Sequence, residues 1–154
     1  MPIMNSKQLT KDPFVMDEDT VNEIVAEYLK RNGFENVSFL TGKQTGVDVQ
    51  GEKEDWNVLV ESKGSQANDH EGETVFDGGQ IKTHTYMQVC KLMELREESN
   101  PSNIMVMANP DIPRIRKRVK AIESSIKELD IVQFWVKENR DVEVILPVDF
   151  GFLF

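Results

Sequence analysis

The chain has 154 residues, enough for one domain that buries a hydrophobic core without disulfides. Its net charge of −9 at pH 7 argues against a protein that binds polyanions through bulk charge, although a local basic surface and metal ions would still offset phosphate repulsion. Cys90 is the only cysteine, so no intramolecular disulfide can form. Without a secretory signal or a long apolar run, the sequence predicts a soluble, cytoplasmic protein with no membrane partner.

The N-terminal half is expected to contain an arm, one helix and three strands. Residues 1–16 show no strong periodicity and are predicted to form the arm, followed by a single domain over 17–154. Acidic residues at 17–19 complement a helix dipole, and apolar residues at helical spacing predict a helix that ends near Gly33. Apolar and β-branched runs predict strands at 34–41, 45–50 and 56–63.

The C-terminal half is expected to alternate helices and strands. The polar loop at 64–79 is long for a compact domain, which predicts a mobile flap or a partner surface. Pro113, with Asp111 as N-cap, predicts a third helix whose apolar stripe continues to Leu129. The aromatic tail at 147–154 either docks on the core or buries against another subunit. The other elements are a helix at 80–98, a central parallel strand at 103–108, and strands at 131–136 and 142–146.

Charged residues close the third predicted strand. Side chains two apart on a strand point to the same face, so Glu61 and Lys63 lie together. If the preceding strand pairs with it as a hairpin, Asp48 lies beside Glu61 at the mouth of an apolar sheet. These charges are costly to gather unless a cation such as Mg²⁺ or Mn²⁺, which prefers carboxylate oxygens, offsets them. A surface hairpin with ordinary salt bridges is the alternative.

Other polar residues have two interpretations each. Gln80 and His84 are four apart on the second predicted helix, and they either face the site or are ordinary polar residues. The basic cluster at the start of the third helix either contacts phosphates or forms a solvated face. This cluster comprises Arg114, Arg116, Lys117, Arg118 and Lys120.

The predicted order helix, strand, strand, strand, helix, strand, helix, strand carries Gly46-Val-Asp48 and Glu61-Ser-Lys63 on adjacent strands. This pattern resembles the PD-(D/E)xK nuclease superfamily, which includes restriction endonucleases, Mrr-like enzymes and archaeal Holliday-junction resolvases. The resemblance covers about residues 20–146. It implies an α/β fold with a restriction endonuclease-like core, in which helices flank a central mixed β-sheet. It also implies a homodimeric, metal-dependent endonuclease or exonuclease that hydrolyses phosphodiester bonds of nucleic acid, with DNA the expected substrate.

The resemblance assigns roles to the motif residues. Asp48 and Glu61 would bind Mg²⁺ or Mn²⁺, and the backbone carbonyl of Ser62 would complete the protein's share of the ligands. Lys63 would activate the attacking water. Gln80 resembles a glutamine that several of these families place at the start of the helix after the lysine strand, which implies a catalytic role.

The chain departs from the family pattern at two positions. Val47 replaces the proline of the superfamily name. Asn22 stands where many members carry a glutamate on the first helix, and either the neighbouring Glu23 or Glu18, one turn earlier, would have to supply the missing metal ligand.

Two other functions stay open at this point. A non-catalytic binding or assembly module of the same fold is favoured by Asn22, the acidic charge and the aromatic tail. A phosphoesterase acting on small nucleotides is the other alternative, although the sequence has no Gly-rich phosphate loop. With no zinc finger or helix-turn-helix, a nuclease of this size is expected to cleave with weak sequence specificity or to recognise nucleic-acid structure.

Overall fold

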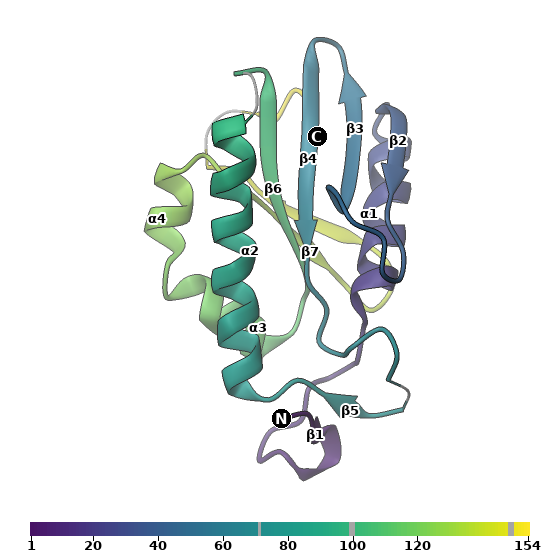
Figure 1. The fold of residues 1–154 in the computed structure, drawn as a ribbon, viewed down its shortest axis with the longest axis vertical. Helices are drawn as coiled ribbons and strands as arrows, with labels where there is room; N and C mark the ends of the chain where they lie inside the picture. The colour runs from purple at the N-terminus through teal and green to yellow at the C-terminus, as the bar shows by residue number, and fades with distance from the viewer. Residues whose placement is uncertain (71, 99–100, 148–149) are drawn as a thin grey trace.

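A computed structural model describes residues 1–70, 72–98, 101–147 and 150–154 of the chain (Figure 1). The helices are α1 (Glu18–Arg31), α2 (Gly78–Glu98), α3 (Pro113–Lys120) and α4 (Glu123–Glu128), with a 3-10 turn, η1, at Asn5–Lys7. The strands of the large sheet are β2 (Glu35–Phe39), β3 (Val49–Lys53), β4 (Trp56–Ser62), β6 (Asn103–Pro110), β7 (Val132–Val136) and β8 (Val142–Ile145). Two further strands are β1 (Ile3–Met4) and β5 (Thr74–Val75). No helix within these ranges is long and apolar enough to cross a membrane.

The large sheet is mixed, with strand order β2-β3-β4-β6-β7-β8. Its first three strands are antiparallel neighbours, β4, β6 and β7 run parallel, and β8 returns antiparallel to β7. In Figure 1, α1 lies behind the sheet, whereas α2 lies in front of it with α3 and α4 beside it. The α/β class with a central mixed sheet flanked by helices is therefore confirmed, while the restriction endonuclease-like core stays a prediction.

Alternating side chains of β4 pack into two different hydrophobic clusters, one on each face of the sheet. Val58 and Val60 are fully buried in the cluster that includes the apolar face of α1. Leu59 packs instead against the cluster on the α2 side, which includes Leu92 of that helix. Because successive strand residues point to opposite faces, Glu61 follows Leu59 toward the α2 side.

The predicted third helix is wrong in its length and in its cap. The chain forms two helices, since Ile122 leaves the helical conformation with φ −124° and ψ 17°. Ile112, without a side-chain hydrogen bond, is the N-cap of α3, and Asp111 pairs instead with Arg116. No Gly or Pro lies at residues 114–128, and Ile115 on α3 and Ile126 on α4 both join one core cluster across the break.

The second predicted strand is displaced along the chain. Residues 45–48 precede the strand, and β3 runs from Val49 to Lys53. Val49 pairs with Val60 of β4, so the hairpin itself agrees with the prediction. Asp48 consequently lies just outside the regular strand.

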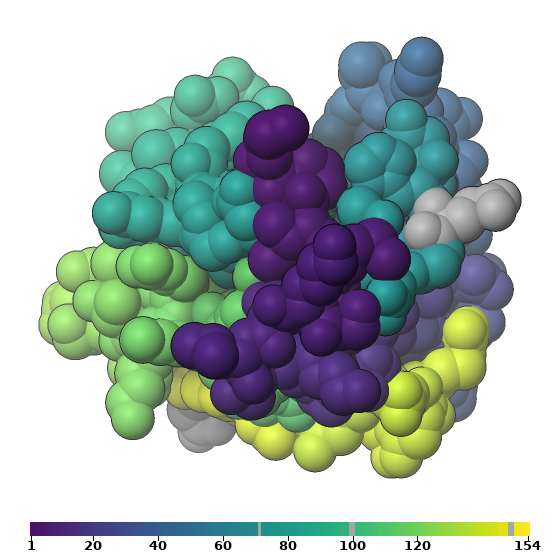
Figure 2. Space-filling model, turned by 90° about the horizontal axis from the view of Figure 1, so that it is seen from below, coloured from purple at the N-terminus to yellow at the C-terminus, as the bar shows by residue number. Residues whose placement is uncertain are grey.

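The N-terminal arm is part of the folded body. Figure 2 shows its purple residues lying across the lower end of the molecule, between the green α3 region and the teal loop. β1 pairs with β5 of that loop, and the amide of Asn5 donates to the carbonyl of Glu73 at 2.9 Å. The amide of Ser65 donates to Met16 O at 2.7 Å. The predicted flap at 64–79, whose residue 71 lies outside the described ranges, thus has the arm of the same chain as its partner.

The aromatic tail docks on the core of its own chain. Leu153 is fully buried, and the ring of Phe154 lies 5.7 Å from Phe34 and 5.4 Å from Phe134. Phe152 stays 56% exposed. Residues 148–149 of the predicted tail lie outside the described ranges. The tail therefore gives no support to a homodimer.

The chain after β4 passes directly over the start of α1. A Cβ at Gly64 would lie 2.5 Å from the amide nitrogen of Glu18 and 2.6 Å from the carbonyl carbon of Asp17. Both neighbours are backbone atoms, which cannot move aside as a flexible side chain would. Glycine permits this approach, and as a result Lys63 and Glu18 line one pocket.

We expect Gly64→Ala to lower the free energy of unfolding by about 2 kcal/mol or more, because the added methyl group overlaps with the α1 backbone. Gly78→Ala is the matched control, since its Cβ would meet no atom within 4 Å. Urea unfolding of both variants measures the difference. Equal stability of the two variants would contradict the close approach.

Candidate active site

Asp48 and Glu61 lie opposite each other at the end of the β3–β4 hairpin. The register pairs Val49 with Val60, so the next residues outward are these two carboxylates. Asp48 Oδ2 accepts a hydrogen bond from the amide of Ser62 at 2.8 Å. This bond fixes the Asp48 side chain against β4 rather than leaving it in the preceding turn.

Glu61 is a buried carboxyl group with an unsatisfied oxygen. It is 9% exposed, and its Oε2 has no hydrogen-bond partner among the described residues. Burial, followed by the charge of Asp48, raises its pKa to about 8, against the opposing charge of Lys63. Burial also raises the pKa of Asp48, which the Ser62 amide and Lys63 partly offset. Without a cation, the pair therefore tends to retain a proton.

Glu18 is the first-helix carboxylate that reaches this region. Burial and then the charge of Asp48 raise its pKa to about 7, and Lys63 lowers it. Glu18 and Lys63 line a pocket of about 190 Å³ together with Phe76 and His84. Of the two candidates to replace the missing glutamate, the structure brings Glu18 to the site.

Asn22 and Glu23 have other contacts. Asn22 is buried and donates through Nδ2 to the carbonyl of Leu40 at 3.2 Å. The carboxylate of Glu23 is 54% exposed, lies 3.6 Å from Arg140 and does not line the pocket. The predicted role of Glu23 as a metal ligand therefore gains no support, because its side chain leaves α1 in another direction.

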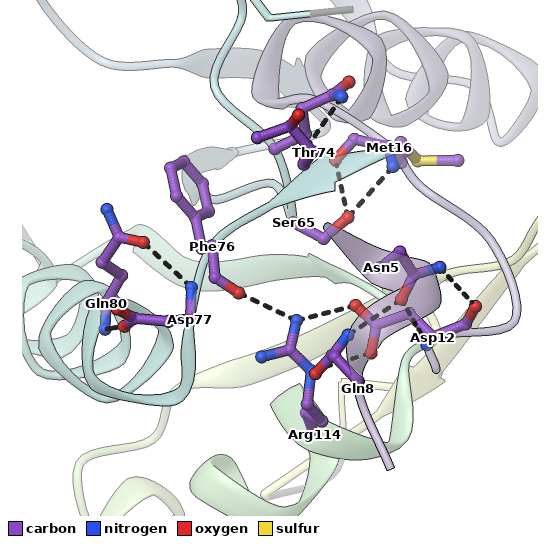
Figure 3. Close-up of polar contacts among 11 residues, drawn as sticks. Asn5, Gln8, Asp12, Met16, Ser65, Thr74, Phe76, Asp77, Gln80 and Arg114 are labelled. Atoms are coloured by element: carbon purple, nitrogen blue, oxygen red, sulfur yellow. Dashed lines mark hydrogen bonds and ion pairs between the residues drawn. The ribbon is translucent and has the colours of Figure 1, made fainter. Parts of the chain in front are cut away.

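Gln80 caps α2 instead of lining the pocket. Its Oε1 accepts from the amide of Asp77 at 2.9 Å, and its own amide donates to Asp77 Oδ1 at 2.8 Å (Figure 3). This reciprocal pair satisfies free amides at the helix start. His84, one turn later, lines the pocket with its ring 4.4 Å from Phe76. Burial lowers the pKa of His84, and the charge of Lys63 adds to that effect.

Arg114 ties the arm to the loop after β4. Its guanidinium forms two bonds to the carboxylate of Asp12, at 2.8 and 2.7 Å, and a third to the carbonyl of Phe76 at 2.9 Å (Figure 3). The Asp12 side chain is only 1% exposed. These contacts give Arg114 a structural role, and its predicted nucleic-acid contact gains no support from them.

The other members of the basic cluster differ in whether they form ion pairs. Arg116 pairs with Asp111 at 2.7 Å and with Glu143 at 3.2 Å, and its guanidinium lies 4.1 Å from the ring centre of Trp135. The predicted patch thus contains fewer free cations than its sequence indicates. The members that form no ion pair within the described ranges are Lys117, Arg118 and Lys120.

Gln88 is a site residue that the sequence analysis missed. It is fully buried on α2, and its Nε2 donates to the carbonyls of Glu61 at 2.9 Å and Ala108 at 3.1 Å. These bonds hold α2 at a fixed rotation over the ends of β4 and β6. The available signal was a polar residue in the buried stripe that also contains Thr85 and Leu92.

The carboxylates at the site suit a hard cation, but they do not form a closed cage. Within the described ranges, no three side chains of His, Cys, Asp or Glu are grouped closely enough to hold a metal ion. Asp48 and Glu61 nevertheless offer two adjacent carboxylates, one with an unpartnered buried oxygen. Mg²⁺ often takes one or two carboxylates and completes its shell with water and substrate phosphates. The residues present fit this mode.

Comparison of the chain with protein-family models, with curated proteins and with solved structures finds no match. Membership of the PD-(D/E)xK superfamily therefore stays a prediction. Its support is the motif and the position of the motif residues at the end of one hairpin.

We expect Arg114→Ala to lower the free energy of unfolding by about 3 kcal/mol, because it leaves the buried Asp12 carboxylate without its partner. Arg118→Ala, which removes a cation outside any ion pair in the described ranges, should change stability by less than about 0.5 kcal/mol. Chemical unfolding of both variants checks this. Weakened nucleic-acid binding with unchanged stability in Arg114→Ala would restore the original prediction.

The crowded carboxyl groups predict a dependence of stability on pH. Folding raises the pKa of Glu61 from 4.5 to about 8 and that of Glu18 from 4.5 to about 7. Between these limits the folded chain holds more protons than the unfolded chain, so the contribution of these groups to stability falls as pH rises.

Raising the pH from about 5 to about 8.5 should lower the free energy of unfolding of the wild type. The decrease should be smaller for Glu61→Gln, which cannot ionise, by on the order of 2 kcal/mol. Urea unfolding in the presence of a chelator measures the two changes. Glu128→Gln, at an exposed position, is the control. The same pH slope in all three proteins would show that Glu61 does not hold the extra proton.

Proposed function

We propose that the chain is a metal-dependent nuclease that hydrolyses phosphodiester bonds of nucleic acid, with DNA as the expected polymer. The observation that supports this most is the Asp48–Glu61 pair at the hairpin end, where Glu61 carries a buried oxygen without a partner. Lys63 acts electrostatically on both carboxyl groups. A salt-bridged surface hairpin does not account for a carboxyl group that is nine-tenths buried.

The proposed mechanism assigns a physical task to each residue. Asp48 and Glu61 would hold Mg²⁺ or Mn²⁺, which would supply a Lewis acid for a phosphate oxygen and lower the pKa of a bound water. A cation there would offset the charge of the crowded pair, whose ionised form burial disfavours. Lys63 orients the attacking water and stabilises the charge that develops on the phosphate oxygens. Glu18 would add a third carboxylate near this pair, in the pocket that it lines together with Lys63.

The second candidate is a non-catalytic module of the same fold. It is favoured by Asn22, which occupies the expected place of a helix glutamate and binds the backbone of Leu40. The presence of Glu18 in the pocket weakens this candidate. The aromatic tail no longer favours this candidate, because Leu153 and Phe154 pack on the core of their own chain instead of forming an assembly surface.

The direct test is hydrolysis of duplex, single-stranded, nicked and branched DNA and of RNA, each with Mg²⁺, Mn²⁺ or chelator. We expect Asp48→Ala and Lys63→Ala to lower metal-dependent cleavage by about 10²-fold or more. Lys82→Ala, an exposed lysine of α2 near the ring of Tyr86, should keep wild-type activity. Equal cleavage by all four proteins would indicate a contaminating enzyme and would refute the proposal.

A second readout separates metal binding from catalysis. A cation that binds only the folded chain raises the melting temperature by mass action. We expect Mn²⁺ to raise the melting temperature of the wild type and not that of Asp48→Ala. A chain without cleavage and without this shift would favour the non-catalytic module.

A further inference from the structure

A second opening lies on the α2 side of Lys63. It encloses about 290 Å³, and Lys63 lines it together with residues of α2. The buried Glu61, with its unpartnered Oε2, also lines this opening, which is therefore continuous with the candidate active site. The α2 residues in its wall are Met87, Cys90, Lys91 and Glu94.

Lys91 is held over this opening by the position of α2. Gln88, one turn earlier, bonds to the carbonyls of Glu61 and Ala108 and fixes the rotation of the helix. Residues three apart on a helix lie on neighbouring faces, so Lys91 follows Gln88 toward the end of β4. The ammonium of Lys91 lowers the pKa of both Asp48 and Glu61, which agrees with this position.

The charge of Lys91 is available to a ligand. Its side chain is exposed and forms no ion pair among the residues that the structure describes. Glu94 lines the same opening without pairing with it. By contrast, Arg114 and Arg116 of the predicted phosphate-binding cluster are held by carboxylates. Among the described residues that line this opening, the cations are Lys63 and Lys91.

A separate groove lies on a part of the sheet that no described helix covers. In Figure 1, α1 lies behind β2 and β3, and no described helix lies in front of these strands. Gln50 of β3 and Asn57 of β4 line a shallow groove there, together with Ser38 of β2. Gln50 lies two residues after Asp48, on the same face of the hairpin. The groove is polar, and Glu52 is the one charged residue among the described residues that line it.

We propose that Lys91 binds a second phosphate, next to the one that meets Asp48, Glu61 and Lys63, so that the substrate is a polynucleotide strand and not a small diester with one phosphate. This inference rests on the proposed nuclease function. Lys63 and Lys91 line one opening together with the buried Glu61, which puts two cations beside the candidate catalytic pair. A mononucleotide diester would leave Lys91 without a contact.

The first test measures binding without turnover. A fluorescent single-stranded oligonucleotide is titrated in Ca²⁺, and anisotropy is followed over a range of salt concentrations. Lys91→Ala should weaken binding about 3- to 10-fold and reduce the salt slope by about one, as expected for the loss of one phosphate contact. Lys82→Ala, on the same helix but outside the opening, should bind like the wild type. Equal binding by both variants would overturn the inference.

The second test compares two substrates with Mn²⁺: the same oligonucleotide and bis(p-nitrophenyl) phosphate, which has a single phosphate. Lys91→Ala should raise KM for the oligonucleotide about 3- to 10-fold more than it raises KM for the small ester. Equal slowing of both reactions would mean that Lys91 acts on the reacting phosphate, which overturns the inference alone. A wild type that neither binds the oligonucleotide nor hydrolyses either substrate would refute the proposed function itself.

Discussion

The β3–β4 register is the constraint on which the candidate site depends. Pairing of Val49 with Val60 sets Asp48 opposite Glu61, and the amide of Ser62 then fixes the Asp48 carboxylate. A shift by one residue would turn each of these side chains to the other face of the sheet. The buried valines of this hairpin oppose such a shift, because they fill the core under α1. Hydrophobic packing on one face thus holds the charged groups in place on the other.

Bringing the carboxyl groups of the site together in partly buried surroundings disfavours their ionised forms. Three carboxyl groups, those of Glu18, Asp48 and Glu61, interact in partly buried surroundings, and the pKa of each is raised. Such crowding reduces the stability of the folded chain at neutral pH unless protons or cations compensate for it. Lys63 and Lys91 provide part of this compensation. An arrangement of this kind is more typical of a functional site than of a structural ion pair.

Segments distant in the sequence build the walls around this site. The arm, through Asp12, and α3, through Arg114, together hold the carbonyl of Phe76. Phe76 in turn lines the pocket with Lys63. Gly64 lets the chain after β4 lie against the first turn of α1, which brings in Glu18. Among the cations of α3, Arg114 therefore contributes to the site by supporting its walls.

The sequence by itself determined the order of the main elements, the hairpin, and the pairing of Asp48 with Glu61, because strand periodicity and adjacent strands fix local geometry. Only the tertiary structure decided the partners of the long polar side chains. In the sequence, Arg114 and Gln80 could bind a ligand. In the structure, Arg114 pairs with Asp12, which is over 100 residues away, and Gln80 caps α2. The tertiary structure also decided that the predicted third helix forms two helices, α3 and α4, and that Glu18 rather than Glu23 lies at the site. Such partners depend on how distant segments pack, which local spacing does not encode.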